Sequence, residues 1–131
     1  MEPQKSIKEI IKDELGKCQK DVVYFIKKYV FIQHPQRGKI PFNLYPFQER
    51  VLKLLTNYEH NDIILKSRQL GISTLVAGLA LWTMLFQYNK LVLVLATKQD
   101  TAKNLINKVL YAYDNLPSWL KLKAIEKNKL S

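Results

Sequence analysis

The chain has 131 residues, which is long enough for one domain with a modest hydrophobic core. An apolar fraction of 47% beside 24% charged residues excludes an intrinsically disordered chain. The net charge of +10 favours a polyanionic partner such as nucleic acid, with a basic surface kept for solubility as the equally weighted alternative.

Residue counts also argue against several kinds of site and location. Cys18 is the only cysteine, so no intrachain disulfide can form and a reducing compartment is expected. His34 and His60 lie far apart with no ligand cluster beside them, so a structural metal is not expected. No apolar segment follows the first residues, as a secretory signal would require. The most apolar window, residues 75–86, is too short to span a bilayer.

Two helices are predicted at the start of the chain. The first is amphipathic, and its end is expected to loosen at Gly16. Its apolar positions recur at helical spacing: Ile7, Ile10, Ile11, Leu15 and Cys18. Asp21 is expected to cap the second helix, whose apolar face reaches Tyr29.

The next segment combines a turn, an extended stretch and a third helix. Residues 34–38 contain a proline and a glycine and predict a turn. Two prolines restrict residues 40–46 to an extended conformation. A helix is expected to begin near Phe47, with Glu49 facing solvent.

A strand–helix–strand–helix order is predicted for the remainder. Residues 62–65 and 91–96 are unalternated apolar runs, typical of strands buried on both faces of a parallel sheet. The helix between them, about residues 73–87, is apolar nearly all round and is expected in the core. Thr97 is expected to begin the last helix, with Asp100 completing a near capping box. Its expected apolar stripe comprises Leu105, Ile106, Val109, Leu110 and Tyr113.

The turn between the first predicted strand and its helix has the features of a phosphate-binding loop. Backbone N–H groups and a helix N-terminus favour a phosphate at such a turn. Gly71 allows close backbone approach and Ser73 offers a hydroxyl for Mg²⁺, but Ile72 stands where the usual pattern has its lysine. Lys66 and Arg68 are the cations that can replace it. The alternative is an ordinary helix N-terminus capped by a hydroxyl.

Tyr45 and Gln48, which precede the predicted phosphate-binding loop, add support for a nucleotide site. Gln48 can form hydrogen bonds with both edges of an adenine, and aromatic residues such as Tyr45 can stack on the base. The alternative is an extended segment that enters a helix, with Phe47 in the core.

Three segments together resemble the N-terminal ATPase domain of the large terminase subunits of tailed bacteriophages. The segments are Tyr45-Pro46-Phe47-Gln48, Lys66-Ser67-Arg68-Gln69-Leu70-Gly71-Ile72-Ser73-Thr74 and Leu95-Ala96-Thr97-Lys98-Gln99. The loop is the specific part of the resemblance. Some members of that family place the lysine at the start of the loop, as Lys66 stands here.

The resemblance implies a fold class, a function and a set of site residues. The fold class is α/β: a helical region over residues 1–44, then over residues 45–131 the first, incomplete βαβα part of a P-loop NTPase (RecA-like) parallel sheet. The implied function is ATP binding by a variant Walker A loop in a motor that packages viral DNA. The implied catalytic cations are Lys66 and Arg68, and Ser73 is the implied Mg²⁺ ligand. The implied ATP-binding residues are Tyr45, Gln48, Ser67, Gln69, Leu70, Gly71, Ile72, Ser73 and Thr74.

Partners and location are implied in the same way. Double-stranded DNA, the portal and the small terminase subunit are the expected partners, with no membrane, and the full-length protein is expected to form a ring. The expected location is the host cell cytoplasm.

The chain departs from the family in its acidic residues. No apolar strand ending in an acidic pair, and no nuclease-like carboxylate cluster, occurs between Gly71 and Ser131. The chain is therefore expected to be the N-terminal piece of a larger protein and inactive as an ATPase alone. Two alternatives stay open: a fragment of a helicase-type ATPase, and a basic nucleic-acid-binding module without a nucleotide.

Overall fold

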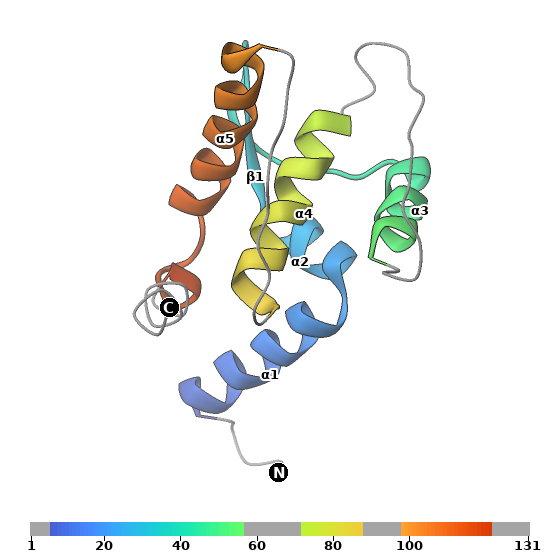
Figure 1. Cartoon of the computed structure of the whole chain (residues 1–131). Helices are drawn as coiled ribbons and strands as arrows, with labels where there is room; N and C mark the ends of the chain where they lie inside the picture. The colour runs from blue at the N-terminus through green and yellow to red at the C-terminus, as the bar shows by residue number, and fades with distance from the viewer. Residues whose placement is uncertain (1–5, 57–71, 88–97, 122–131) are drawn as a thin grey trace.

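The computed structural model describes residues 6–56, 72–87 and 98–121. This part of the chain is mostly helical, with one two-stranded antiparallel sheet (Figure 1). The helices are α1 (Ile7–Lys20), α2 (Val22–Tyr29), α3 (Pro46–Leu55), α4 (Ile72–Phe86) and α5 (Gln99–Asp114). The strands are β1 (Phe31–His34) and β2 (Gly38–Pro41). Among the described residues, no helix combines the length and the hydropathy that crossing a bilayer demands.

Asp21 lies between the first two helices, as the C-cap of α1 and the N-cap of α2. The Asp21 carboxylate accepts hydrogen bonds from the backbone N–H groups of Val23 and Tyr24, at 3.0 and 3.3 Å, which confirms the predicted cap. The expectation that α1 loosens at Gly16 is wrong, because the helix continues to Lys20. A helix-interior glycine costs only about 1 kcal/mol, and the burial of Cys18 two residues later offsets that cost.

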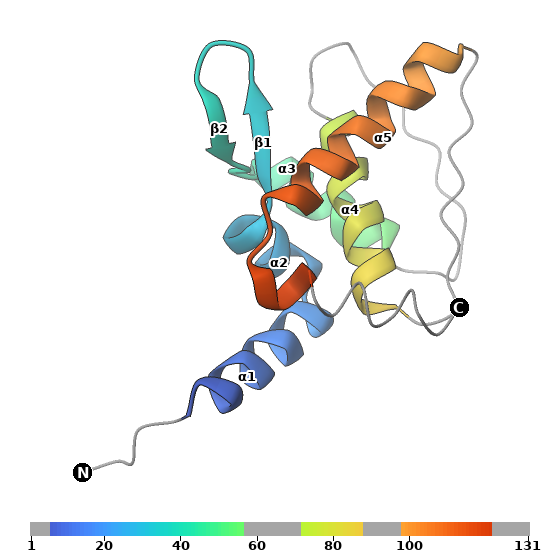
Figure 2. The same ribbon diagram turned by 90° about the vertical axis from the view of Figure 1, so that its left-hand side faces the viewer.

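A β-hairpin lies within the region that was expected to be helical. Its turn is the predicted one, and the His34 Nδ1 accepts hydrogen bonds from two backbone N–H groups of that turn, those of Gln36 and Arg37, both at 3.1 Å. Gly38 has a φ of 72°, which a side chain would disfavour. The strands pair in register from Phe31 opposite Pro41 to His34 opposite Gly38. Figure 2 shows the hairpin projecting from the helices.

Helix α4 forms the centre of the described fold. It contacts every other described helix (Figures 1 and 2), and its core position confirms the prediction made from its apolar sequence. Gly78 allows α2 to approach closely, since a Cβ atom there would lie 3.2 Å from Ile26 Cδ1. Trp82 is 5% exposed, and its indole N–H donates to the Cys18 carbonyl at 2.8 Å. The buried residues of α4 are Ile72, Leu75, Ala77, Gly78, Ala80, Leu81, Trp82, Leu85 and Phe86.

The last helix differs from its prediction at its start and in its buried face. It begins at Gln99 with Lys98 as N-cap and no side-chain capping bond, while Thr97 lies outside the described residues. Ile106 and Leu110 were expected to be buried but are 48% and 52% exposed. The smaller Ala112 is buried instead, because a small side chain allows α5 to approach its neighbours closely.

Glu49 was expected to face solvent. It is half-buried, and its carboxylate forms an ion pair with the exposed Lys27 of α2 that links α2 with α3. The two predicted parallel strands, residues 62–65 and 91–96, lie outside the described residues.

Candidate functional site

The predicted phosphate-binding residues divide into two groups. Lys66, Ser67, Arg68, Gln69, Leu70 and Gly71 lie outside the described residues. Ile72, Ser73 and Thr74 form the first turn of α4, immediately after Gly71. Ile72 is buried, Ser73 is exposed and Thr74 is half-buried, so the two hydroxyl-bearing residues are the accessible ones. The predicted helix after the loop is therefore present.

The predicted adenine-binding residues lie at the start of α3. The Tyr45 side chain is 65% exposed, and its ring stacks on that of Phe47 with the centroids 6.0 Å apart and 7° between the planes. Gln48 is 3% exposed, and its Oε1 accepts a hydrogen bond from the Tyr45 backbone N–H at 2.9 Å. The amide oxygen of Gln48 thus stabilises the start of α3, a role that the sequence analysis did not assign to it.

The described residues of the predicted adenine site and of the predicted phosphate site lie at the starts of two neighbouring helices. Helices α3 and α4 are in contact, and both begin at the upper side of Figure 1. Tyr45 and Gln48 stand at one of these helix starts, and Ser73 and Thr74 stand at the other.

The described residues at the start of α4 offer Mg²⁺ one suitable ligand, the Ser73 hydroxyl. Mg²⁺ prefers oxygen ligands and often keeps several waters while it bridges to phosphates, so an exposed serine hydroxyl such as that of Ser73 suits it. In the described part of the chain, no three His, Cys, Asp or Glu side chains lie close enough to form a metal site. Among the described residues at this helix start, the Ser73 hydroxyl is the candidate ligand, and phosphate oxygens and water are further ligands that Mg²⁺ accepts.

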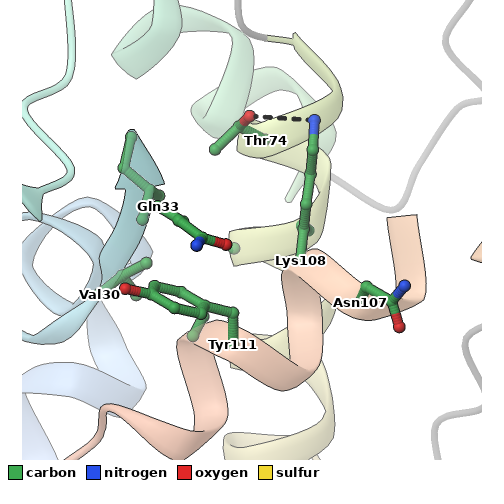
Figure 3. A pocket seen from close by; sticks show the side chains of 10 residues that line it. Val30, Gln33, Thr74, Asn107, Lys108 and Tyr111 are labelled. Carbon is green, nitrogen blue, oxygen red and sulfur yellow. Dashed lines mark hydrogen bonds between the residues drawn. The ribbon is translucent and has the colours of Figure 1, made fainter. Parts of the chain in front are cut away.

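An open cavity of about 210 Å³ lies between β1, α4 and α5 (Figure 3). Its apolar wall includes Ala77 and Gly78 on α4, whose small size leaves the space open. The polar side chains that line it are Gln33, Thr74, Asn107, Lys108 and Tyr111. The Lys108 ammonium donates to the Thr74 hydroxyl at 3.5 Å, and this bond joins α5 to the first turn of α4.

The cavity and most of the residues that line it were not predicted from the sequence. Thr74 was a predicted site residue, but Gln33, Lys108 and Tyr111 were not. These three come from two elements far apart in sequence, and no motif connects them. A weak signal was available, since Lys108 lies outside the apolar stripe of its helix.

A cluster of ionisable side chains with shifted pKa values lies away from this cavity, between α1 and α2. The Glu14 carboxylate accepts hydrogen bonds from the hydroxyls of Tyr29 and Tyr24 and from the Lys28 ammonium. The Tyr29 bond is the main cause that lowers the pKa of Glu14 from 4.5 to about 2, with the other two donors adding to it. Burial and the neighbouring Glu14 carboxylate raise the pKa of Tyr29 above its usual range. This cluster joins the two helices.

The Glu14→Gln substitution is expected to lower the free energy of unfolding at pH 7 by about 1–3 kcal/mol, because it weakens charge-assisted hydrogen bonds. A depressed carboxyl pKa contributes stability above the unfolded value of 4.5, and that stability is lost as the pH falls toward about 2. Urea unfolding between pH 7 and pH 2 should therefore show a shallower acid loss in the variant. Glu9→Gln, an exposed carboxylate of the same helix, controls for the loss of one charge. Equal slopes for wild type and Glu14→Gln would contradict this prediction.

No protein-family model matches the chain.

Proposed function

We propose that the chain is the N-terminal part of a large terminase subunit and binds the phosphates of ATP through a variant Walker A loop. The observation that carries this proposal is helix α4, which is described from Ile72 onward and follows the Ser-Arg-Gln-Leu-Gly segment in the sequence. A phosphate-binding loop requires a helix that begins at this point, since the first N–H groups of the helix face the ligand.

The directions of the last two helices support the same proposal. Helices α4 and α5 are in contact and both run downward in Figure 1, while Figure 2 shows α5 crossing α4 obliquely. Successive helices of a βαβα unit run in the same direction because each follows a parallel strand. An α-helical hairpin with a short loop would place them antiparallel.

Each proposed site residue has a separate role. Lys66 is the proposed phosphate-contacting lysine, with Arg68 as the second cation, and the Ser73 hydroxyl would ligate the Mg²⁺ that accompanies the triphosphate. Tyr45 offers an exposed ring on which a base can stack. The proposed macromolecular partners are double-stranded DNA, the portal and the small terminase subunit, in the cytoplasm of the host cell.

Two other functions are weighed against this one. A basic nucleic-acid-binding module without a nucleotide is favoured by the net charge of +10. A helicase-type ATPase is disfavoured by Ile72, because helicases usually keep a lysine at that position of the loop. ATP binding, measured with and without Mg²⁺, separates the basic module from the two ATPases.

Lys66→Ala is expected to weaken ATP binding at least about tenfold, because one charge-assisted phosphate contact is lost. Arg68→Ala should have the smaller effect. Isothermal titration calorimetry with Mg²⁺·ATP is the suitable measurement, since the acidic pair needed for turnover is not in this chain. Lys12→Ala, an exposed lysine on α1, is the matched control. Unchanged affinity in Lys66→Ala would remove Lys66 from the site, and no ATP binding by the wild type would exclude the proposed function.

A further inference from the structure

We propose that the cavity between β1, α4 and α5 is a phosphate subsite, in which Lys108 supplies a positive charge in addition to the cations of the loop. The ligand is a phosphate group of a nucleoside triphosphate. This inference rests on the proposed function for the nucleotide, but the cavity, the lysine and the hydroxyl are observed independently of the loop.

The first argument is the charge balance around Lys108. Its ammonium contacts the Thr74 hydroxyl at 3.5 Å, and within the described residues it forms no ion pair. The first turn of α4 contains no acidic residue. A cation near the positive end of a helix dipole is placed unfavourably, unless an anion lies between them. A phosphate in the cavity would interact favourably with both the Lys108 ammonium and the positive N-terminal end of α4.

The second argument is the set of donors around the cavity. Figure 3 shows Lys108 and Thr74 facing one another across its upper side, with the Gln33 amide extending from β1 toward α4 below them. The Tyr111 hydroxyl points toward Val30, away from this pair, and has no part in the assignment. An ammonium, a hydroxyl and an amide can all donate hydrogen bonds to phosphate oxygens. Asn107 points away from the Lys108–Thr74 pair and has no part in this assignment.

The third argument is size and shape. A volume of about 210 Å³ is smaller than the roughly 300–1,000 Å³ of sites that enclose a whole small ligand. The cavity therefore suits one part of a nucleotide rather than all of it. It is concave and bounded by three elements, whereas a DNA backbone is usually contacted along an extended basic surface.

The test uses the full 131-residue chain and three probes: Mg²⁺·ATP, inorganic pyrophosphate and a short DNA duplex. Lys108→Gln is expected to weaken the binding of ATP and of pyrophosphate about tenfold, and Lys108→Arg is expected to retain most of the affinity. Lys103→Gln, which removes an exposed lysine of the same helix that does not line the cavity, should leave both affinities unchanged. Thermal unfolding of each variant confirms that the fold is kept.

The outcomes separate this inference from the proposed function. ATP binding by the wild type that is unchanged in Lys108→Gln overturns the inference and leaves the proposed function standing. Pyrophosphate binding that depends on Lys108, without any binding of ATP, supports the phosphate subsite and overturns the nucleotide as its source. Loss of DNA binding alone in Lys108→Gln overturns the inference in favour of a nucleic-acid contact. Binding of neither ATP nor pyrophosphate by the wild type overturns both.

Discussion

Replacing Trp82 with alanine is expected to lower the free energy of unfolding by about 3–5 kcal/mol. The indole is 5% exposed in the centre of the core, so its removal leaves a cavity that α1, α2 and α4 cannot fill without moving. The substitution also leaves the Cys18 carbonyl without its indole donor. Because domains of this size are stable by only about 5–15 kcal/mol, a large share of the fold's stability depends on this residue.

Urea unfolding followed by circular dichroism measures this loss, and two further variants separate its causes. Trp82→Phe keeps most of the ring but removes the donor, so it should cost only about 1–3 kcal/mol. Ile106→Ala removes a 48% exposed side chain from α5 and should cost much less than Trp82→Ala. Comparable losses for Ile106→Ala and Trp82→Ala would show that Trp82 does not lie in the core.

The second large effect is expected at Leu52. This residue is fully buried on α3, whereas Leu54, two positions later on the same helix, is 56% exposed. Leu52→Ala is expected to cost about 2–5 kcal/mol, since it removes apolar burial and leaves a void beneath α3. Leu54→Ala should change the free energy of unfolding by less than about 0.5 kcal/mol.

The Leu52 and Leu54 pair is a matched comparison, because both substitutions remove the same atoms from the same helix and change helix propensity equally. Chemical denaturation of the two variants in parallel gives the difference directly. If the larger loss occurred at Leu54, the face of α3 that packs on the core would be the opposite of the one described here.

Local signals in the sequence predicted the helices that depend on local chemistry. The Asp21 carboxylate caps α2 through contacts two and three residues away. Helix α3 was predicted to begin near Phe47, but Pro46, which was expected to be extended, is its first residue, because the fixed φ of proline suits that position. The apolar composition of α4 required burial on all sides, whatever its neighbours. These elements were predictable because their causes lie within a few residues of each other.

The features that were missed depend on contacts between distant segments. The turn at residues 34–38 was predicted, but the pairing of Phe31 with Pro41 was not, because proline was interpreted only as a constraint toward extended backbone. The buried face of α5 differs from its most apolar stripe, since what decides burial is the approach of other elements rather than the hydrophobicity of the helix. The two strands and the first part of the loop remain predictions.

For the candidate site, too, the local features were predictable from the sequence and the contacts between distant residues were not. A motif placed Ser73 and Thr74 at the start of a helix, and that helix is present. No motif could indicate that Gln48 Oε1 stabilises the start of its own helix, or that Lys108 contacts Thr74 across 34 positions of sequence. Such contacts arise from tertiary packing, which the order of residues encodes only indirectly.

The buried Cys18 thiol can report on the separation of α1 from α4. It is the only cysteine in the sequence, it is fully buried and in no disulfide, and its carbonyl accepts the Trp82 indole N–H across the contact between α1 and α4. A thiol reagent reacts only with an accessible thiolate, so the rate of alkylation measures how often these two helices separate. Because no second thiol competes, that rate can be followed in the unmodified chain, without an engineered label and without denaturant.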